Sequence, residues 1–203
     1  KNYFGLEDLK AVGYQPVDFK KAGINVAECL ACGFDLGDLF AGHYTATEIR
    51  ACGTKFPCAD LIAEGYTIEN LKAAMYSVED LLQANISVPE LKACGFKVLA
   101  LCLGGMSDIS ILRESGYTAV NMYEANVTAV YCKAAGYSCT ELIRAGYEII
   151  PLFECGFTAK DMFEANVTAD ALYQTKQLTF QNLRSAGFTL TDCRAAGMGA
   201  SAA

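Results

Sequence analysis

Hydrophobic and polar positions recur with a period of ten along nearly the whole chain. Cutting before the aromatic or aliphatic residue that follows a Gly or Asn gives units such as FGLEDLKAVG, YQPVDFKKAG and INVAECLACG. About 19 units run from Phe4 to Gly197, with small insertions near Thr54 to Gly65, Met106 to Gly116 and Gln177 to Gly187. A regular internal period of this kind predicts a repeat architecture.

Three positions of the unit mark the start and the end of a short helix. Position two is mostly Ser, Thr, Asn or Asp, and position five is often acidic, which is the pattern of a capping box at a helix N-terminus. Position ten is usually Gly or Asn, the residues that best tolerate the left-handed conformation just past a helix. All four prolines fall in the first turn of this register, where a missing N–H costs little: Pro16, Pro57, Pro89 and Pro151.

The remaining positions predict how these helices pack. Position six is always apolar, position nine is small, and the aromatic residue at position one contacts both the helix before it and the helix after it. A helix of about two turns is unstable by itself, because nucleation is costly and few hydrogen bonds follow it. The sequence therefore predicts an all-α solenoid in which stacked helices bury the residues at position six.

The number of helices in each turn of the solenoid is inferred from a longer echo. The segment EANVTA occurs twice, 40 residues apart, beginning at Glu124 and at Glu164. This spacing favours a roughly square coil of four units, in which Cys52 and Cys94 would be buried near neighbours in successive coils. At a helix spacing of roughly 9 Å, nearly five coils would form a rod about 45 Å long. The alternative is a two-helix, 20-residue layer of the kind found in ordinary α-solenoids.

The pattern predicts a single repeat domain over residues 1–203, with repeats over 4–197 and a flexible tail over 198–203. Solenoids normally need terminal repeats with a polar outer face. Neither the first nor the last unit has one, so we expect at least one end to be covered by another copy, by a partner protein or by further sequence.

Charge and hydropathy narrow the choice of partners. The formal net charge is −7, which argues against nucleic acid because phosphate binding needs clustered cations. The longest apolar run, KVLALCLGGM from Lys97, is too short to cross a bilayer, and no signal peptide is visible. We expect other proteins as partners, including a second copy arranged end to end, and no membrane insertion.

Few residues are candidates for chemistry. His43, the only histidine, stands at a position that is normally Gly or Asn, so it is either a lone acid, base or metal ligand or a residue chosen for the left-handed conformation, which we favour. Cys29 and Cys32 have the spacing of a redox or zinc motif, but no second pair exists and both occupy core positions of the repeat. No catalytic, cofactor-binding or metal-binding residue is therefore assigned, and no cofactor or enzyme activity is expected.

The ten cysteines and three Asn-x-Ser/Thr patterns bear on the compartment. Cysteines used as apolar core residues favour a reducing environment, inside a cell or in a virion, with an extracellular location as the alternative. Asn85, Asn126 and Asn166 match the glycosylation pattern. However, any Asn at position ten is followed two residues later by the capping Ser or Thr, so the repeat itself creates the pattern.

The segments LKAVGYQ, LKACGFK and IRAGYE follow a Leu-Lys-x-Ala-Gly-aromatic pattern. This pattern resembles the decapeptide short-helix repeats of protist, algal and large-virus proteins, over nearly the whole chain. The resemblance implies a scaffold or interaction module. We therefore expect a structural scaffold that forms a rigid rod in a larger assembly, or a module that recognises a protein or peptide on one face. The insertions near Phe56 and Gln177 are the positions where a binding face is expected.

Overall fold

The computed structural model describes residues 5–198, and every regular element in that range is an α-helix. The chain divides into two compact units, which are described separately. The first extends to Phe96 and includes Leu103–Gly105, and the second comprises Lys97–Cys102 together with the residues from Met106 onward. The prediction of an all-α solenoid is confirmed. The prediction of one domain over residues 1–203 stays a prediction.

The described residues contain 19 helices of six or seven residues each. Among them, no helix has the length and apolar composition that a membrane-spanning segment needs. In chain order the helices are α1 (Leu6–Ala11), α2 (Pro16–Lys21), α3 (Val26–Ala31), α4 (Leu36–Ala41), α5 (Ala46–Ala51), α6 (Cys58–Ala63), α7 (Ile68–Ala73), α8 (Val78–Gln83), α9 (Val88–Ala93), α10 (Val98–Leu103), α11 (Ile109–Glu114), α12 (Ala119–Glu124), α13 (Ala129–Ala134), α14 (Cys139–Ala145), α15 (Ile149–Glu154), α16 (Ala159–Glu164), α17 (Ala169–Gln174), α18 (Phe180–Ala186) and α19 (Leu190–Ala195).

The helices begin where the sequence predicts. In α14, Ser138 Oγ accepts a hydrogen bond from the Glu141 N–H at 3.3 Å, and Glu141 Oε2 accepts one from the Ser138 N–H at 2.8 Å. The N–H and the hydroxyl of Ser138 lower the pKa of the Glu141 carboxyl, because they stabilise its charged form. The predicted starting residues are all N-caps: Thr45, Thr67, Ser77, Ser87, Thr118, Ser138 and Thr158.

Three of the four prolines lie in the first turn of a helix, as predicted. Pro16 is the first residue of α2, Pro89 the second residue of α9 and Pro151 the third residue of α15. The fourth is one position earlier than predicted, because Pro57 is the N-cap of α6. In none of these places does proline remove a hydrogen bond within the helix.

The helices also end as predicted, at a left-handed residue in position ten. After α14, the Gly146 N–H donates to the Ile143 carbonyl at 3.0 Å, and the Tyr147 N–H donates to the Leu142 carbonyl at 3.1 Å. This pair of bonds is a Schellman motif, and Gly146 has a φ of 102°. Six units use other residues with positive φ at this position: His43, Met75, Asn85, Asn126, Asn166 and Lys176.

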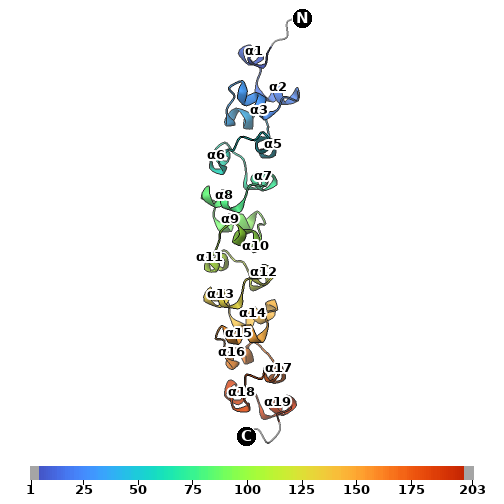
Figure 1. Cartoon of the computed structure of the whole chain (residues 1–203), viewed down its shortest axis with the longest axis vertical. Coiled ribbons are helices and arrows are strands. Elements are labelled where there is room, and N and C mark those ends of the chain that lie inside the picture. Colours follow the sequence, from blue (N-terminus) through green and yellow to red (C-terminus); the bar gives the residue numbers. More distant parts are fainter. Residues whose placement is uncertain (1–4, 199–203) are drawn as a thin grey trace. The chain divides into compact units, whose positions relative to one another are not determined.

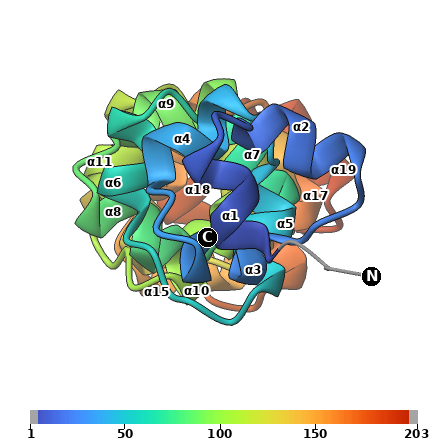
Figure 2. The ribbon, with the colours of Figure 1, turned by 90° about the horizontal axis from the view of Figure 1, so that it is seen from above.

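Helices pack on the helices two positions further along the chain. In the first unit α2 packs on α4, α5 on α7 and α6 on α8; in the second α11 packs on α13, α12 on α14 and α13 on α15. Figure 1 shows the result, with α6 and α8 on one side of the first unit and α5 and α7 on the other. In the view of Figure 2, α2 and α4 again lie next to each other. Each layer therefore contains two helices.

The prediction of a four-unit, 40-residue coil is wrong, and the 20-residue layer is the arrangement that forms. A helix of six residues is about 9 Å long, close to the distance between packed helices, so two helices and two corners complete a layer. The predicted neighbours Cys52 and Cys94 are also wrong. The Cys94 thiol donates to Glu69 Oε1 at 3.2 Å, on α7, whereas Cys52 follows α5.

The residues at position six form the interior, as predicted. From Phe19 in α2 to Cys193 in α19 each of them is at most 1% exposed, whereas Leu9 in α1 is half-buried. No polar or charged residue is buried among the described residues. Leucine, isoleucine, phenylalanine, methionine and cysteine all serve at this position, so apolar volume is what the interior requires.

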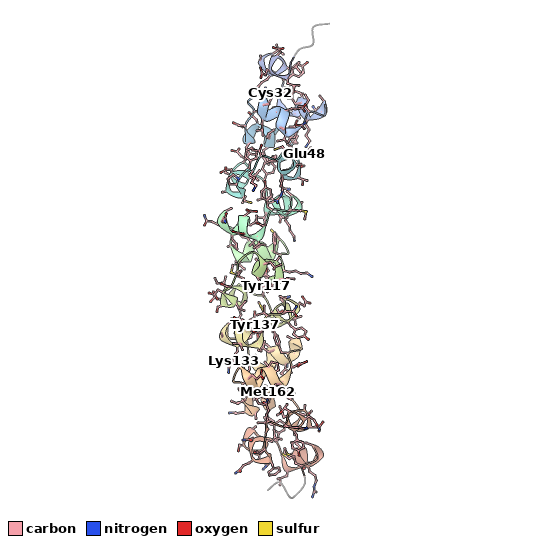
Figure 3. All side chains as sticks on the ribbon, viewed as in Figure 1. Cys32, Glu48, Tyr117, Lys133, Tyr137 and Met162 are labelled. Carbon is pink, nitrogen blue, oxygen red and sulfur yellow. The ribbon has the colours of Figure 1, made fainter. Side chains whose placement is uncertain are left out.

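Tyrosines at position one link each layer to the layer before it. The Tyr137 hydroxyl donates to the Tyr117 carbonyl at 2.6 Å, and the Tyr147 hydroxyl donates to the Val127 carbonyl at 2.6 Å. Both links join position one of units that are 20 residues apart, which is the length of one layer. Figure 3 marks Tyr117 and Tyr137 one above the other in the second unit.

The buried phenols make the fold sensitive to alkaline pH. Burial raises the pKa of Tyr66 and of Tyr137 from 10.0 to about 12, because a buried phenolate lacks hydration. The unfolded chain ionises first, so the contribution of these groups to stability is complete below pH 10 and is lost as the pH rises toward 12. We expect the free energy of unfolding to fall over this interval. Denaturant titrations at several pH values test this, and a constant free energy of unfolding from pH 9 to 12 would contradict it.

The end of the described chain differs from the predicted tail. Met198, which the prediction placed in the tail, is buried, and its N–H donates to the Cys193 carbonyl at 3.2 Å. It takes the place of the aromatic residue that normally follows a corner. The predicted start of the repeats at Phe4 and the remainder of the tail lie outside the described residues.

Candidate interaction surface

The single histidine has a backbone role. His43 adopts a φ of 62° at the corner between α4 and α5, and its carbonyl accepts a hydrogen bond from Lys20 Nζ. Among residues 5–198, no group of three or more His, Cys, Asp or Glu side chains is arranged to hold a metal ion. The structure thus places His43 where a left-handed residue is needed.

The Cys29 and Cys32 pair is split between the interior and a helix end. Cys29 is fully buried and its sulfur lies 3.2 Å from the Tyr44 hydroxyl, whereas Cys32 is half-buried at the C-cap of α3. Burial raises the pKa of the Cys29 thiol, and its contact with Tyr44 works in the opposite direction. A thiol with a raised pKa is a poor nucleophile, so this pair lacks the character of a redox motif.

A recurring clamp at position seven was missed in the sequence. Lys133 Nζ donates to the Cys155 carbonyl at 3.0 Å and lies 4.6 Å from the centre of the Phe157 ring. The end of α15 carries partial negative charge and the ring face is electron-rich, so one cation satisfies both. Lys133 is labelled in Figure 3. The same arrangement recurs with Lys10 over Phe34, Lys20 over Tyr44, Lys72 over Phe96 and Arg113 over Tyr137.

Other units place an aromatic ring at position seven instead of a cation. The Tyr123 and Tyr147 rings meet edge to face with their centres 5.3 Å apart. Phe40 and Tyr66 meet in the same way in the first unit, at 4.8 Å. Position seven of one unit therefore contacts position one that begins three units later, and this contact fastens each layer to the next.

The clamp is expected to stabilise the fold measurably. Lys133→Met keeps the aliphatic stem and removes the charged hydrogen bond and the cation–π contact, so we expect a loss of about 1–2 kcal/mol. Lys160→Met is the matched control, because Lys160 is exposed and reaches only Glu164 at 3.9 Å. Urea unfolding of both variants tests this, and equal losses would argue against a role for the clamp.

Shallow grooves recur between successive layers. Each is lined by positions two to four of one unit and by positions five, eight and nine of the unit two further on. One of about 560 Å³ lies between α3 and α5, and one of about 230 Å³ lies between α6 and α8. In the second unit, grooves of about 720 Å³ and 580 Å³ lie between α15 and α17 and between α17 and α19. These grooves are consequences of the small residues at positions eight and nine.

One set of stacked helices departs from the repeat pattern on its outer side. At positions four and five, where most units carry polar or acidic residues, α11, α13 and α15 expose Ile111, Val130, Tyr131 and Ile150 to 40%, 56%, 61% and 43%. We call these four residues the α11–α15 face. The groove of about 720 Å³ adjoins it, because Ile150 lines that groove.

The insertions expected to mark a binding face are only partly informative. Phe56 lines the small groove between α6 and α8. The Gln177 N–H donates to Thr175 Oγ1 at 3.4 Å in the second unit. Because the two residues belong to different units, their predicted alignment in one column stays a prediction. The apolar residues at positions four and five were the better signal, and they are visible in the sequence.

The structure thus defines an α-solenoid of ten-residue units with two helices in each layer. The family described as "Decapeptide repeat region" matches residues 26–98 and 136–203, which together exceed half of the chain. The chain belongs to the decapeptide repeat family, and the resemblance seen in the sequence is confirmed. No curated protein and no solved structure matches the chain.

Proposed function

We propose that the chain is a structural scaffold that serves as a rigid rod within a larger protein assembly. The observation that carries this proposal is the recurring clamp between layers, formed by a cation or an aromatic ring at position seven. Such contacts tie successive layers together, which resists bending and local opening. Family membership supports the general role of a repeat-protein scaffold.

The use of charged groups supports a function other than catalysis. Carboxylates with a lowered pKa, such as those of Glu90 and Asp192, owe the shift mainly to hydrogen bonds from the N-cap residue of their own helix. The raised pKa values of Cys58 and Cys139 come from burial. These shifts follow the repeat and do not converge on one cleft, which is what an active site requires.

Isolation of the chain from its native source tests the scaffold proposal. We expect the full chain, after mild cross-linking, to sediment in a particle much larger than the monomer, with a constant set of other proteins or further copies of itself. A chain that sediments as a monomer both in the native extract and after purification at high concentration would contradict this proposal.

We also propose that the chain works in a reducing compartment, inside a cell or in a virion. All ten cysteines are free thiols, and five of them are buried in the interior. Mass spectrometry of the unreduced native protein should find free thiols and unmodified Asn85, Asn126 and Asn166. Disulfides at most of the cysteines would favour the extracellular alternative.

A second candidate function is recognition of a protein or peptide on one side of the solenoid. It is favoured by the α11–α15 face, because a plain spacer would repeat the same polar outer positions throughout. The two functions are compatible, since a scaffold needs at least one surface that its partners recognise.

A further inference from the structure

We propose that the α11–α15 face binds a segment of a partner protein in which aromatic or aliphatic side chains alternate with Lys or Arg. The apolar side chains of the segment would pack on Tyr131 and its apolar neighbours, and the cations would reach carboxylates beside them. This inference rests on the protein-binding role proposed above and gives that role a location and a partner chemistry.

The geometry of the repeat brings the four apolar residues to one side. In a helix of 3.6 residues per turn, positions four, five and eight point away from position six, which faces the interior. Val130 and Tyr131 on α13 therefore lie on the outer side, opposite the buried Cys132. Because α13 packs on both α11 and α15, the outer sides of the three helices adjoin.

These apolar residues occupy positions where a polar residue would stabilise the chain itself. The neighbouring helices α12, α14, α16 and α18 all have a complete capping box. In α13 the Thr128 hydroxyl makes no capping bond, and Tyr131 stands where the acidic partner of the box belongs. An aromatic side chain that is 61% exposed and replaces a cap gains little within the chain. Local departures of this kind are expected at functional sites.

The charges around the face select a basic partner. Glu114, Glu148 and Glu154 are exposed carboxylates on or next to α11 and α15, and none of them takes part in a hydrogen bond or an ion pair in the described structure. The cations of these layers are engaged in clamps, since Arg113 lies over Tyr137 and Lys133 over Phe157. The face therefore presents negative charge around an apolar centre, and it attracts cations.

The same charges disfavour other occupants. A second copy would bring its own net charge of −7 to an acidic face. Nucleic acid and anionic membranes would be repelled for the same reason. A basic segment of a different protein is the occupant that both the apolar centre and the carboxylates fit.

A displayed library of random 16-residue peptides, selected on the full chain, tests the inference directly. The variant Val130→Gln/Tyr131→Glu removes the centre of the face and supplies the missing acidic residue of the capping box in α13. We expect its melting temperature to be unchanged or higher, so a loss of binding cannot be attributed to unfolding. Val120→Gln is the matched control, because Val120 is 46% exposed on α12, outside the face.

We expect the enriched peptides to combine apolar residues with Lys or Arg. A synthetic copy of one of them should bind the double variant at least tenfold more weakly in fluorescence anisotropy, bind the control variant normally and weaken as salt is raised. Enrichment of neutral or acidic peptides, no enrichment above background, or equal affinity for the double variant would each overturn the inference.

The outcomes separate this inference from the scaffold proposal. If the double variant abolishes self-association of the chain in sedimentation, the occupant is a second copy and the basic partner is wrong, while the scaffold role stands. If basic peptides bind the face but the native chain is a free monomer, the face is confirmed and the scaffold role is wrong.

Discussion

Gly42→Ala is expected to lower the free energy of unfolding by about 1–3 kcal/mol, although it adds a single methyl group. Gly42 is the buried C-cap of α4, where α4 packs on α2. A Cβ at this position would lie 2.6 Å from Pro16 Cβ, 3.0 Å from the Pro16 carbonyl carbon and 3.1 Å from the Val17 nitrogen. Two of these three atoms are backbone, so the layers must separate to make room.

The matched control lies five residues away in the same helix. At Gly37 the nearest atom to an added Cβ is the carboxylate oxygen of Glu64, at 2.7 Å, which is the far end of an exposed and flexible side chain. Gly37→Ala is therefore expected to stabilise the chain by about 0.5–1 kcal/mol, since alanine favours a helix. Chemical denaturation of both variants measures the difference. Equal effects would contradict the packing of α4 directly on α2.

Most of the local structure can be predicted from the sequence, because each short helix carries its own start and stop signals. Thr45 and Gly146, for example, are an N-cap and a left-handed corner as expected. These signals depend on contacts within one unit, at separations of at most five residues. Periodicity and capping chemistry are sufficient to predict such contacts.

The number of helices per layer could not be predicted from the 40-residue echo, because an echo of that length also fits two layers of 20 residues. The better signal is the match between position seven and a position one about 24 residues later. Lys10 precedes Phe34, Lys133 precedes Phe157 and Tyr123 precedes Tyr147 by that spacing. Each of these pairs is a contact between layers in the structure.

The candidate interaction surface was harder to predict than the fold, for a physical reason. Apolar residues at positions four and five are read in a sequence as part of a helix's buried side unless the packing of its neighbours is known. Ile111 and Val130 are recognised as exposed only when α11 and α13 are stacked in one layer series. Exposure depends on contacts 20 residues away, which local patterns do not contain.

Leu142→Ala is expected to be the more damaging of the two core substitutions discussed, with a loss of about 2–5 kcal/mol. Leu142 occupies position six of α14, has no exposed area, and its helix packs between α12 and α16. The backbone of a six- or seven-residue helix fixed by caps at both ends has little freedom to move inward, so most of the lost volume remains as a cavity. The interior is one side chain wide at each layer, so the loss also weakens the contacts between the layers on either side.

Leu190→Ala provides the same chemical change at a place where little is lost. Leu190 is 63% exposed at the start of α19, and we expect a change below about 0.5 kcal/mol. Thermal and urea unfolding of the two variants, with the same slope against urea as the wild type, would establish that only native packing has changed. A small loss for Leu142→Ala would show that the interior at position six tolerates a void, and it would contradict a rigid core.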